Sequence, residues 1–337
     1  RVMKRKTGEE VTQLENLKKQ YDLLMDTEEG YDLVKTRYEN YLDRIRGELG
    51  DKKAYAEKPL GNILLTGGTG YLGSYMLREL LTGSDSPSAS ELQENKIFLL
   101  LRNGKGMEEV KEKMNFYFPE MDLSQYQERM EIVHGDVGKS ALGLEEGEYE
   151  KLAQVVDSIF HCAGMISHFA KQEEMEQVNQ ESVRSLCQFA EKGKRKTLHH
   201  MSTTRLLEND GDEEFSMYTE YSDIEKDKFS DMYSESKYKA EKIIEEYRKR
   251  GCDIRIYRIG TILFDSQNGK FQKNIDDNSF YQIMKSFFNL GIIPDLDFEI
   301  IDFSFVDYTA KAIVLLAGHG KKNENYHVFN NHKLSTG

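Results

Sequence analysis

One short glycine-rich stretch constrains the fold of this chain more than any other feature. The segment Thr66-Gly-Gly-Thr-Gly-Tyr-Leu-Gly73 follows the apolar run 63–65, and residues 71–81 after it carry apolar side chains at helical spacing. The order is therefore strand, tight turn and helix. An ordinary loop is the alternative interpretation, but a strand before the glycines and a helix after them favour dinucleotide binding.

Each part of the turn has a distinct predicted role. The first glycine permits the bend, the second lets a pyrophosphate approach the backbone, and the third lets the helix pack on the strand. The helix N-terminus offers free N–H groups and a positive dipole to the phosphates. The expected contacts are Thr66, Gly67, Gly70, Tyr71, Leu72 and Gly73.

Strand-like and helix-like segments alternate after the turn. Strands are expected at 63–65, 96–101, 130–134, 157–162, 197–201 and 253–258, and helices at 71–81, 107–118, 148–155, 171–192 and 231–250. This order predicts an α/β fold, a Rossmann-type doubly wound parallel sheet with helices on both faces and ligands at the carboxyl ends of the strands.

The pattern also predicts how the chain is divided. Residues 1–57 hold two amphipathic helical runs and form a helical leader or linker, and residues 58–262 form the dinucleotide-binding Rossmann domain. Residues 263–337 form a smaller substrate-binding lobe interleaved with the last Rossmann elements, with its own helix at 279–290. The irregular insertion at 206–230 contributes to the same lobe. Because the chain begins with Arg1 and stops without a tail, we expect it to be a piece of a longer polypeptide.

Composition excludes several classes of function. A net charge of −13 over 337 residues argues against a nucleic-acid partner. The longest apolar runs, such as 97–101 and 312–317, are too short to span a membrane, and no signal peptide is visible, so we expect a cytoplasmic protein. The three cysteines lie far apart without metal-ligand spacing, which predicts a reducing compartment and no structural metal.

The end of the second predicted strand indicates NADP rather than NAD. An NAD site usually places a carboxylate there to bind the ribose hydroxyls, whereas this strand is followed by Arg102. A guanidinium can form a fork to a 2′-phosphate and stack on adenine, and Lys113 is a possible second contact. The alternative is an ordinary surface arginine.

Two further pairs of residues follow strands and are predicted to contact the cofactor. Asp136 and Val137 come after the third strand, where adenine would lie. Ala163 and Gly164 come after the fourth strand, where small residues let the cofactor approach the backbone.

Tyr233 and Lys237 are the candidate catalytic pair. Residues four apart share a helix face, so the Lys237 ammonium is expected to lie near the phenol, lower its pKa and reach the nicotinamide ribose. Such a phenol can protonate the oxygen of a carbonyl that accepts a hydride. The same spacing occurs at Tyr31/Lys35, Tyr238/Lys242 and Tyr281/Lys285, but Tyr233 alone begins the helix between the fifth and sixth strands.

A hydroxyl cluster follows the fifth strand. Thr203 is the candidate second donor to the oxyanion, and Ser202 and Thr204 are alternatives. Turn chemistry explains many such clusters, but here three elements converge on one sheet edge. His199 and His200 are interpreted as packing residues, and His161 and His168 have no metal partner set. The absence of a Gly-x-Ser-x-Gly motif disfavours a serine thioesterase.

Together these residues resemble the extended short-chain dehydrogenase/reductase superfamily, through the segment 66–73, Ser202-Thr203 and Tyr233-x-x-x-Lys237. Within it, residues 60–330 are most similar to the thioester reductase domain that terminates nonribosomal peptide synthetases, which is related to carboxylic acid reductase and fatty acyl-CoA reductase domains. The supporting stretches are 99–102, 135–137, 161–164, 178–179, 257–262 and 306–308.

The resemblance implies that NADPH reduces an acyl or peptidyl thioester held on the phosphopantetheine arm of a carrier domain, which would be part of the same polypeptide. Thr203, Tyr233 and Lys237 would be the catalytic set, and Arg102 would bind the 2′-phosphate. The hemithioacetal would collapse to an aldehyde, and a second round would give an alcohol. No enzyme nucleophile is needed.

The sequence departs from this family pattern in three places. Thr204-Arg-Leu follows Ser-Thr where a small apolar run is expected, and Phe305 stands where proline is usual. The C-terminal helical part of such domains is absent after Gly337, so we expect a truncated substrate lobe.

Two other functions stay open. A nucleotide-sugar epimerase or dehydratase shares the glycine turn and the Tyr/Lys helix, although Arg102 and the expected excision from a longer chain count against it. A protein that senses NADP without turnover would not need Tyr233 and Lys237, so Tyr233→Phe separates a sensor from an enzyme.

Overall fold

The computed structural model describes residues 59–83, 95–102, 104–164, 172–207, 231–291 and 303–330, with the single residues 220, 224 and 229. The chain divides into two compact units, and the elements described below belong to the unit made of residues 57–206 and 226–337. The predicted helical leader, His168 and most of the insertion at 206–230 lie outside the described residues, and the predictions about them stay predictions.

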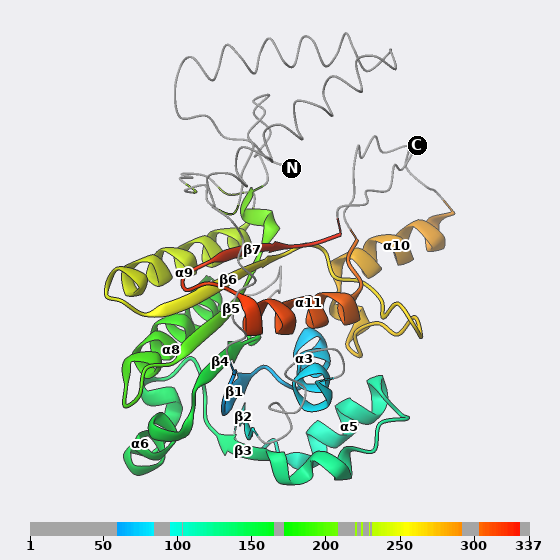
Figure 1. The fold of residues 1–337 in the computed structure, drawn as a ribbon. Coiled ribbons are helices and arrows are strands. Elements are labelled where there is room, and N and C mark those ends of the chain that lie inside the picture. The colour runs from blue at the N-terminus through cyan, green and yellow to red at the C-terminus, as the bar shows by residue number, and fades with distance from the viewer. Residues whose placement is uncertain are drawn as a thin grey trace, which may run out of the picture. The chain divides into compact units, whose positions relative to one another are not determined.

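Within the described residues, seven parallel strands form one sheet in the order β3-β2-β1-β4-β5-β6-β7 (Figure 1). The order reverses at β1, because the chain runs outward to β3 and then returns to β4 on the other side of β1. Parallel sheets bind ligands at this switch point, outside the carboxyl ends of the strands. The predicted Rossmann-type fold is confirmed. The strands are β1 (Ile63–Thr66), β2 (Ile97–Leu101), β3 (Met130–His134), β4 (Ser158–His161), β5 (Thr197–Thr203), β6 (Asp253–Ile259) and β7 (Asn325–Val328).

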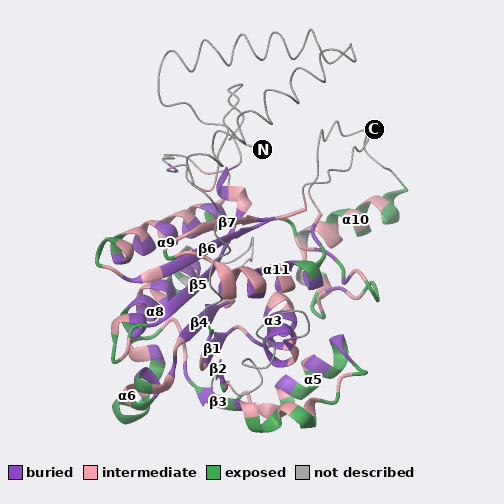
Figure 2. Cartoon of the chain, in the orientation of Figure 1, coloured by how far each residue is buried: buried purple, intermediate pink, exposed green. Residues whose placement is uncertain are grey.

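Helices cover both faces of this sheet (Figure 1). One face carries α3 (Tyr71–Thr82), α5 (Met107–Tyr117) and α11 (Val306–His319), and the other carries α6 (Glu146–Val155), α8 (Ser182–Glu191) and α9 (Met232–Lys249). Strand side chains alternate between two cores: Ile63 and Leu65 pack with α3, and Leu64 packs with α8 and α9. Strands buried on both faces need apolar residues throughout, which explains the continuous apolar runs of β1 and β2 (Figure 2).

Two parts of this architecture differ from the pattern expected from the sequence. The sheet continues past β6 to β7, whose residues Asn-Tyr-His-Val are mostly half-buried and lack a strand-like apolar pattern. The expected helix at 171–192 is divided into α7 (Gln172–Glu176), a π-helical turn η3 (Gln177–Glu181) and α8. Such π-turns are frequent at functional sites.

Between β6 and α11, the segment 263–273 is tied to the glycine-turn helix. The Tyr71 hydroxyl donates to the carbonyl oxygens of Leu263 at 2.5 Å and Lys270 at 3.2 Å. Helix α10 (Ser279–Leu290) follows as predicted and begins where the Asn278 side chain accepts a hydrogen bond from the Tyr281 N–H. Several large apolar side chains of α10 are exposed (Figure 2).

Candidate active site

The glycine turn after β1 is held tightly against the end of β4. Gly67 has a φ of +72°, and a Cβ at this position would lie 2.5 Å from the backbone nitrogen of Ala163. A Cβ at Gly73 would lie 2.0 Å from the carbonyl oxygen of Gly67. Side chains at these two positions would therefore force the strand and the helix apart, and the turn has the conformation that the glycine spacing predicts.

The start of α3 can receive an anion. Gly70 precedes the helix in an extended conformation and has no side chain with which to cap it. The first-turn N–H groups of an uncapped helix are free to bind a phosphate, and the helix dipole favours negative charge there. These features fit the pyrophosphate of a dinucleotide. Leu72 packs on the core beneath, so its side chain anchors the turn.

A buried network supports the turn from below. The Thr66 hydroxyl lies 2.8 Å from Nδ1 of His161, and Nε2 of His161 lies 3.1 Å from the Ser182 hydroxyl. Because Ser182 donates to the carbonyl oxygen of Val178, it accepts from Nε2–H, and Nδ1 accepts from Thr66. Burial lowers the pKa of His161 to about 3, so the ring is neutral. The Thr66 side chain is fully buried and therefore joins β1 to β4 instead of facing a ligand.

Thr203, Tyr233 and Lys237 converge at the carboxyl end of β5. The Thr203 hydroxyl lies close enough to the Tyr233 phenol to oppose the rise in its pKa. Nζ of Lys237 lies 6.0 Å from the centre of the Tyr233 ring and donates to the carbonyl oxygen of Met201 at 2.9 Å. Helix α9 presents both residues to the sheet because Asp231 caps its start, accepting from the N–H of Ser234 at 2.7 Å.

The pKa values of the two ionisable groups of this cluster are both shifted by burial. Burial lowers the pKa of Lys237 to about 8. Burial also raises the pKa of the Tyr233 phenol to about 12, against the opposing effects of Thr203 and Arg205. The pKa of Tyr233 is therefore raised overall and not lowered as predicted, because desolvation of the phenolate dominates. The phenol stays protonated at neutral pH.

The catalytic candidates adjoin the cofactor turn. A Cβ at Gly164, just after β4, would lie 3.4 Å from Nζ of Lys237 and 3.5 Å from Oδ1 of Asn179. Gly164 is exposed and Ala163 is half-buried, so open backbone lies between the glycine turn and Lys237. A flat ring seated there would meet the α9 side chains directly.

The predicted adenosine contacts lie along the other side of the switch point. Arg102 follows β2 and is exposed, and Lys113 is half-buried on α5. Burial and the neighbouring charge of Lys273 lower the pKa of Lys113, as expected where cations crowd together. Asp136 and Val137 follow β3, and the Asp136 carboxylate accepts from the N–H of Gly138 at 3.0 Å. These residues share one sheet edge, but no direct contact joins Arg102 to Lys113.

Other reactive side chains near the site are inert. Burial raises the pKa of the Cys162 thiol to about 12, so it is protonated. Among the described residues, no group of three or more His, Cys, Asp or Glu side chains is arranged to hold a metal ion. His199 stacks on Phe160 and pairs with the Tyr257 hydroxyl at 2.8 Å, in line with its predicted packing role. In the part of the chain that the structure describes, no helix has the length and apolar character needed to cross a bilayer.

A comparison with known protein families finds a match that spans this site. Residues 65–313, more than half of the chain, match the NAD-binding family described as "Male sterility protein". The chain belongs to this male sterility family. The match includes the glycine turn after Thr66, together with Lys113, Tyr233 and Lys237.

Relatives of this male sterility family member include reductase domains of peptide synthetases. It is 29% identical over 272 residues to a linear gramicidin synthase of Brevibacillus parabrevis, covering 79% of this chain but 5% of that protein. The terminal R domain from the myxalamid PKS-NRPS pathway matches with a TM-score of 0.73 and 27% identity, over 83% of this chain and 68% of that one. An archaeal thiolation-reductase di-domain matches with a TM-score of 0.70 and 29% identity, over 83% and 58%.

These likenesses confirm the resemblance to terminal reductase domains that the motifs predict. The male sterility family also supports a nicotinamide cofactor, since it is named as an NAD-binding family. The family match does not distinguish NADPH from NADH. The residues that bear on this choice are Arg102 and Lys113.

One site residue of this family member had no predicted role. Asn179 is buried in the π-helical turn η3, and its side-chain amide donates to the Ser236 hydroxyl at 3.0 Å. Ser236 in turn donates to the carbonyl oxygen of Tyr233 at 2.8 Å. Asn179 thus connects η3 to the start of α9. The sequence of residues 171–192 has the periodicity of one continuous α-helix, so it gives no sign of the π-helical turn that contains Asn179.

Proposed function

We propose that the protein is an NADPH-dependent reductase that releases a carrier-bound acyl or peptidyl thioester as an aldehyde. The observation that carries this proposal is the convergence of Thr203, Tyr233 and Lys237 at the sheet edge that also holds the glycine turn. A hydride acceptor at this edge would have its oxygen between two hydroxyl donors. The reductase domains among the relatives support the same interpretation.

Each catalytic candidate has a role that follows from its surroundings. Bound NADPH supplies the hydride that reduces the thioester carbon. The phenol of Tyr233 is protonated at neutral pH, so it can donate its proton to the developing alkoxide, and the Thr203 hydroxyl can donate a second hydrogen bond. The buried ammonium of Lys237 stabilises negative charge on the phenol oxygen while the proton moves.

A second donor of electrons or an enzyme nucleophile is not required. Reduction of the thioester gives a hemithioacetal, which breaks its C–S bond to leave a thiol on the carrier and a free aldehyde. The protonated thiol of Cys162 is a poor nucleophile, so acyl transfer to the protein is disfavoured. A second hydride transfer to the aldehyde would give the alcohol.

The cofactor choice follows from charge. Arg102 is exposed at the end of β2 with no carboxylate in its place, and Lys113 lies on the helix that follows. A guanidinium fork matches a 2′-phosphate, whereas NAD would present a ribose hydroxyl with no acceptor. We therefore propose NADPH as the physiological cofactor.

The substrate side is proposed from the arrangement of the chain. Residues 58–262 would hold the cofactor, and residues 263–337 with α10 would contribute to the substrate lobe. A phosphopantetheinylated carrier domain on the same polypeptide is the proposed partner, in line with the thiolation-reductase di-domain among the relatives. We propose that this assembly works in the cytoplasm.

The test is a direct assay of the 337-residue chain. The protein is mixed with NADPH and an acyl-phosphopantetheine or acyl-CoA thioester, and loss of reduced-nicotinamide absorbance is followed together with aldehyde formation. The proposal predicts consumption of NADPH that depends on the thioester and is slower with NADH. Turnover of a nucleotide sugar instead would support an epimerase or dehydratase, and cofactor binding without any turnover would support a sensor.

A further inference from the structure

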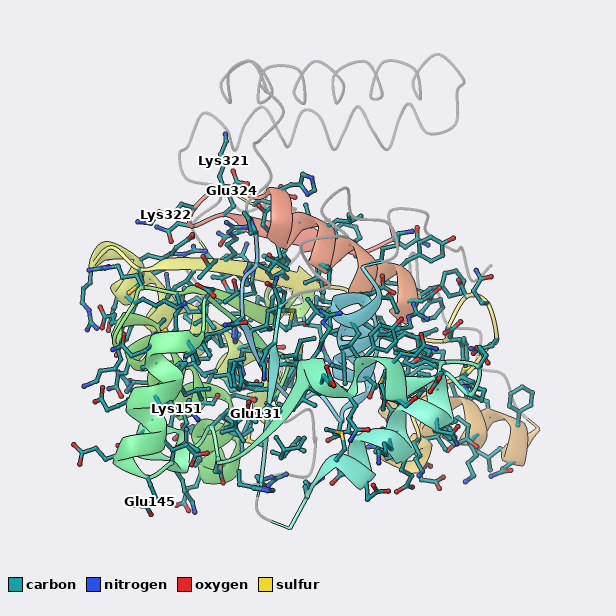
Figure 3. The ribbon with its side chains drawn as sticks, turned by 60° about the horizontal axis from the view of Figure 1, so that its bottom comes forward. Glu131, Glu145, Lys151, Lys321, Lys322 and Glu324 are labelled. Atoms are coloured by element: carbon teal, nitrogen blue, oxygen red, sulfur yellow. The ribbon has the colours of Figure 1, made fainter. Side chains whose placement is uncertain are left out.

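A buried ion pair lies directly behind the catalytic cluster. Most charged residues of this acidic chain are at its surface, as Glu145 and Lys322 are at the rim of the molecule (Figure 3). Glu241 on α9 and Arg258 on β6 are exceptions, because both side chains are 4% exposed. Nη2 of Arg258 lies 2.8 Å from Oε2 of Glu241, and Nε lies 3.2 Å from Oε1.

The groups around this ion pair lie at the same register position on neighbouring strands. Ser202 of β5 is the register partner of Arg258, which is the register partner of His327 on β7. The Ser202 hydroxyl donates to Oε1 of Glu241 at 2.6 Å, and Nη1 of Arg258 lies 3.3 Å from Nε2 of His327. The Glu241 carboxylate thus gathers groups from neighbouring strands onto α9. Removing water from two charges is costly, so a pair at this depth needs these additional hydrogen bonds.

Three consecutive residues of β5 each adjoin a different side chain of α9. Lys237 donates to the Met201 carbonyl oxygen at 2.9 Å, Glu241 accepts from Ser202, and the Thr203 hydroxyl lies near the Tyr233 phenol. The three α9 residues are spaced four apart and share one face of the helix. Tyr233 and Lys237 are the proposed catalytic groups of this set, and Glu241 is the part that the proposed chemistry does not use.

We propose that Glu241 is a positioning residue for the reductase reaction: held by Arg258, its carboxylate fixes Ser202 and the end of β5 against α9 and supplies the counter-charge for Lys237. This inference rests on the proposed function and adds a residue to it. Glu241 acts through Lys237 and through the strand that carries Thr203. It touches neither substrate nor cofactor.

The charges around Lys237 make this role specific. Tyr233 and Glu241 face it from α9, His161 and Cys162 from the end of β4, and His200 from β5. The phenol and the thiol are protonated at neutral pH, and the pKa values of both histidines are lowered, so these four groups are neutral. Glu241 is the group in this set that carries negative charge. Its charge raises the pKa of Lys237 against the effect of burial.

The test is the pH profile of Glu241→Gln, which removes the charge while keeping the shape and the hydrogen-bond acceptor. The alkaline limb of kcat reports loss of the Lys237 proton. In Glu241→Gln this limb should move to lower pH by on the order of one unit. The kcat at pH 8 should fall about fivefold while KM for the thioester is unchanged. Glu241→Asp keeps the charge and should keep the wild-type limb. Glu245→Gln, on the outer face of α9, should match wild type throughout.

Ser202→Ala provides a second variant that leaves the ion pair in place and serves if Glu241→Gln does not fold. It should lower kcat without moving the alkaline limb, because it loosens β5 and leaves the charge intact. Wild-type limbs in Glu241→Gln, with a folded protein, would overturn the inference, as would a wild-type kcat in Ser202→Ala. Failure of the proposed function is a different result, since wild-type protein would then not reduce the thioester at all.

Discussion

Helix α9 carries two Tyr-x-x-x-Lys pairs in opposite surroundings, and the contrast explains why one of them is the proposed catalytic pair. Tyr233 and Lys237 face the sheet, where Lys237 is 5% exposed and donates to the carbonyl oxygen of Met201. Tyr238 and Lys242 face outward, where the Lys242 side chain is 36% exposed and pairs with Glu245 at 3.2 Å. Both amines lie near their rings, at 6.0 Å and 5.2 Å from the ring centres.

The spacing alone therefore brings an amine to a phenol, but it does not make the phenol a catalyst. Lys242 is exposed to solvent and pairs with the surface carboxylate of Glu245, so the electrostatic effect of its charge on Tyr238 is screened. Lys237 is desolvated, donates to a strand carbonyl oxygen and feels the charge of the buried Glu241 carboxylate. What distinguishes the inner pair is its place at the carboxyl end of β5, beside Thr203 and near Gly164 at the end of β4.

The largest expected effect comes from removing one phenol hydroxyl from each pair. Tyr233→Phe should lower kcat for thioester reduction by about a thousandfold, because the proton donor is lost. Tyr238→Phe should leave kcat unchanged. The measurement is NADPH consumption under saturating thioester, with NADPH binding by fluorescence as the control for folding. Equal activity in the two variants would erase the distinction between the pairs.

The second expected effect identifies which hydroxyl acts with Tyr233 as the second donor to the oxyanion. Thr203→Val removes the hydroxyl beside Tyr233 and should lower kcat about a hundredfold, as loss of one oxyanion donor does elsewhere. Thr204→Val is the matched control, since the Thr204 hydroxyl donates to the Ile259 carbonyl oxygen at 3.4 Å and should matter little. A larger loss in Thr204→Val than in Thr203→Val would move the oxyanion site by one residue.

The third effect is a pH dependence that the outer pair does not share. Burial lowers the pKa of Lys237 from its ordinary value to about 8, so its protonated fraction falls as pH rises through that value. Because the charged form supports the reaction, kcat should decline above about pH 8. Replacing Lys237 with Met should lower kcat and abolish this limb, whereas Lys242→Met should retain both the rate and the limb. Stopped-flow single turnovers across pH separate this effect from product release.

The smallest expected effect concerns the cofactor and leaves both pairs intact. Arg102→Ala should raise KM for NADPH about tenfold by removing a charged hydrogen-bond donor, with KM for NADH unchanged. Lys111→Ala, an exposed cation of α5 that pairs with Glu108, is the control and should alter neither. A loss of NADH affinity equal to the loss of NADPH affinity would contradict a 2′-phosphate contact at Arg102.

The sequence predicts the fold well where elements repeat a strong local pattern. Buried apolar runs mark β1 and β2, and the glycine spacing fixes the turn between β1 and α3 because a Cβ has no room at Gly67 or Gly73. The edge strand β7 could not be predicted from the sequence, because its residues are half-buried and need no apolar pattern. The π-turn at Asn179 could not be predicted either, because one extra residue in a long helix barely disturbs its periodicity.

At the site, residue identity is easier to predict than electrostatics. The convergence of Thr203, Tyr233 and Lys237 follows from the order of strands, since carboxyl ends of parallel strands share one edge. The sign of the Tyr233 pKa shift does not follow from it, because desolvation depends on how deeply the phenol is packed. The same holds for Glu241 and Arg258, whose pairing needs the register of β5 and β6. Their burial could not be predicted from a helix pattern that also contains exposed glutamates.

The central claim is that the inner pair of α9 protonates an oxygen while a hydride reaches the same carbonyl carbon. The most direct measurement uses NADPH carrying deuterium at C4 of the nicotinamide, an acyl-phosphopantetheine thioester and the 337-residue chain. The account predicts an aldehyde with one deuterium on its carbonyl carbon, formed at a rate that Tyr233→Phe lowers and Tyr238→Phe does not. Oxidation of NADPH without deuterium in the product, or an equally fast transfer in Tyr233→Phe, would contradict it.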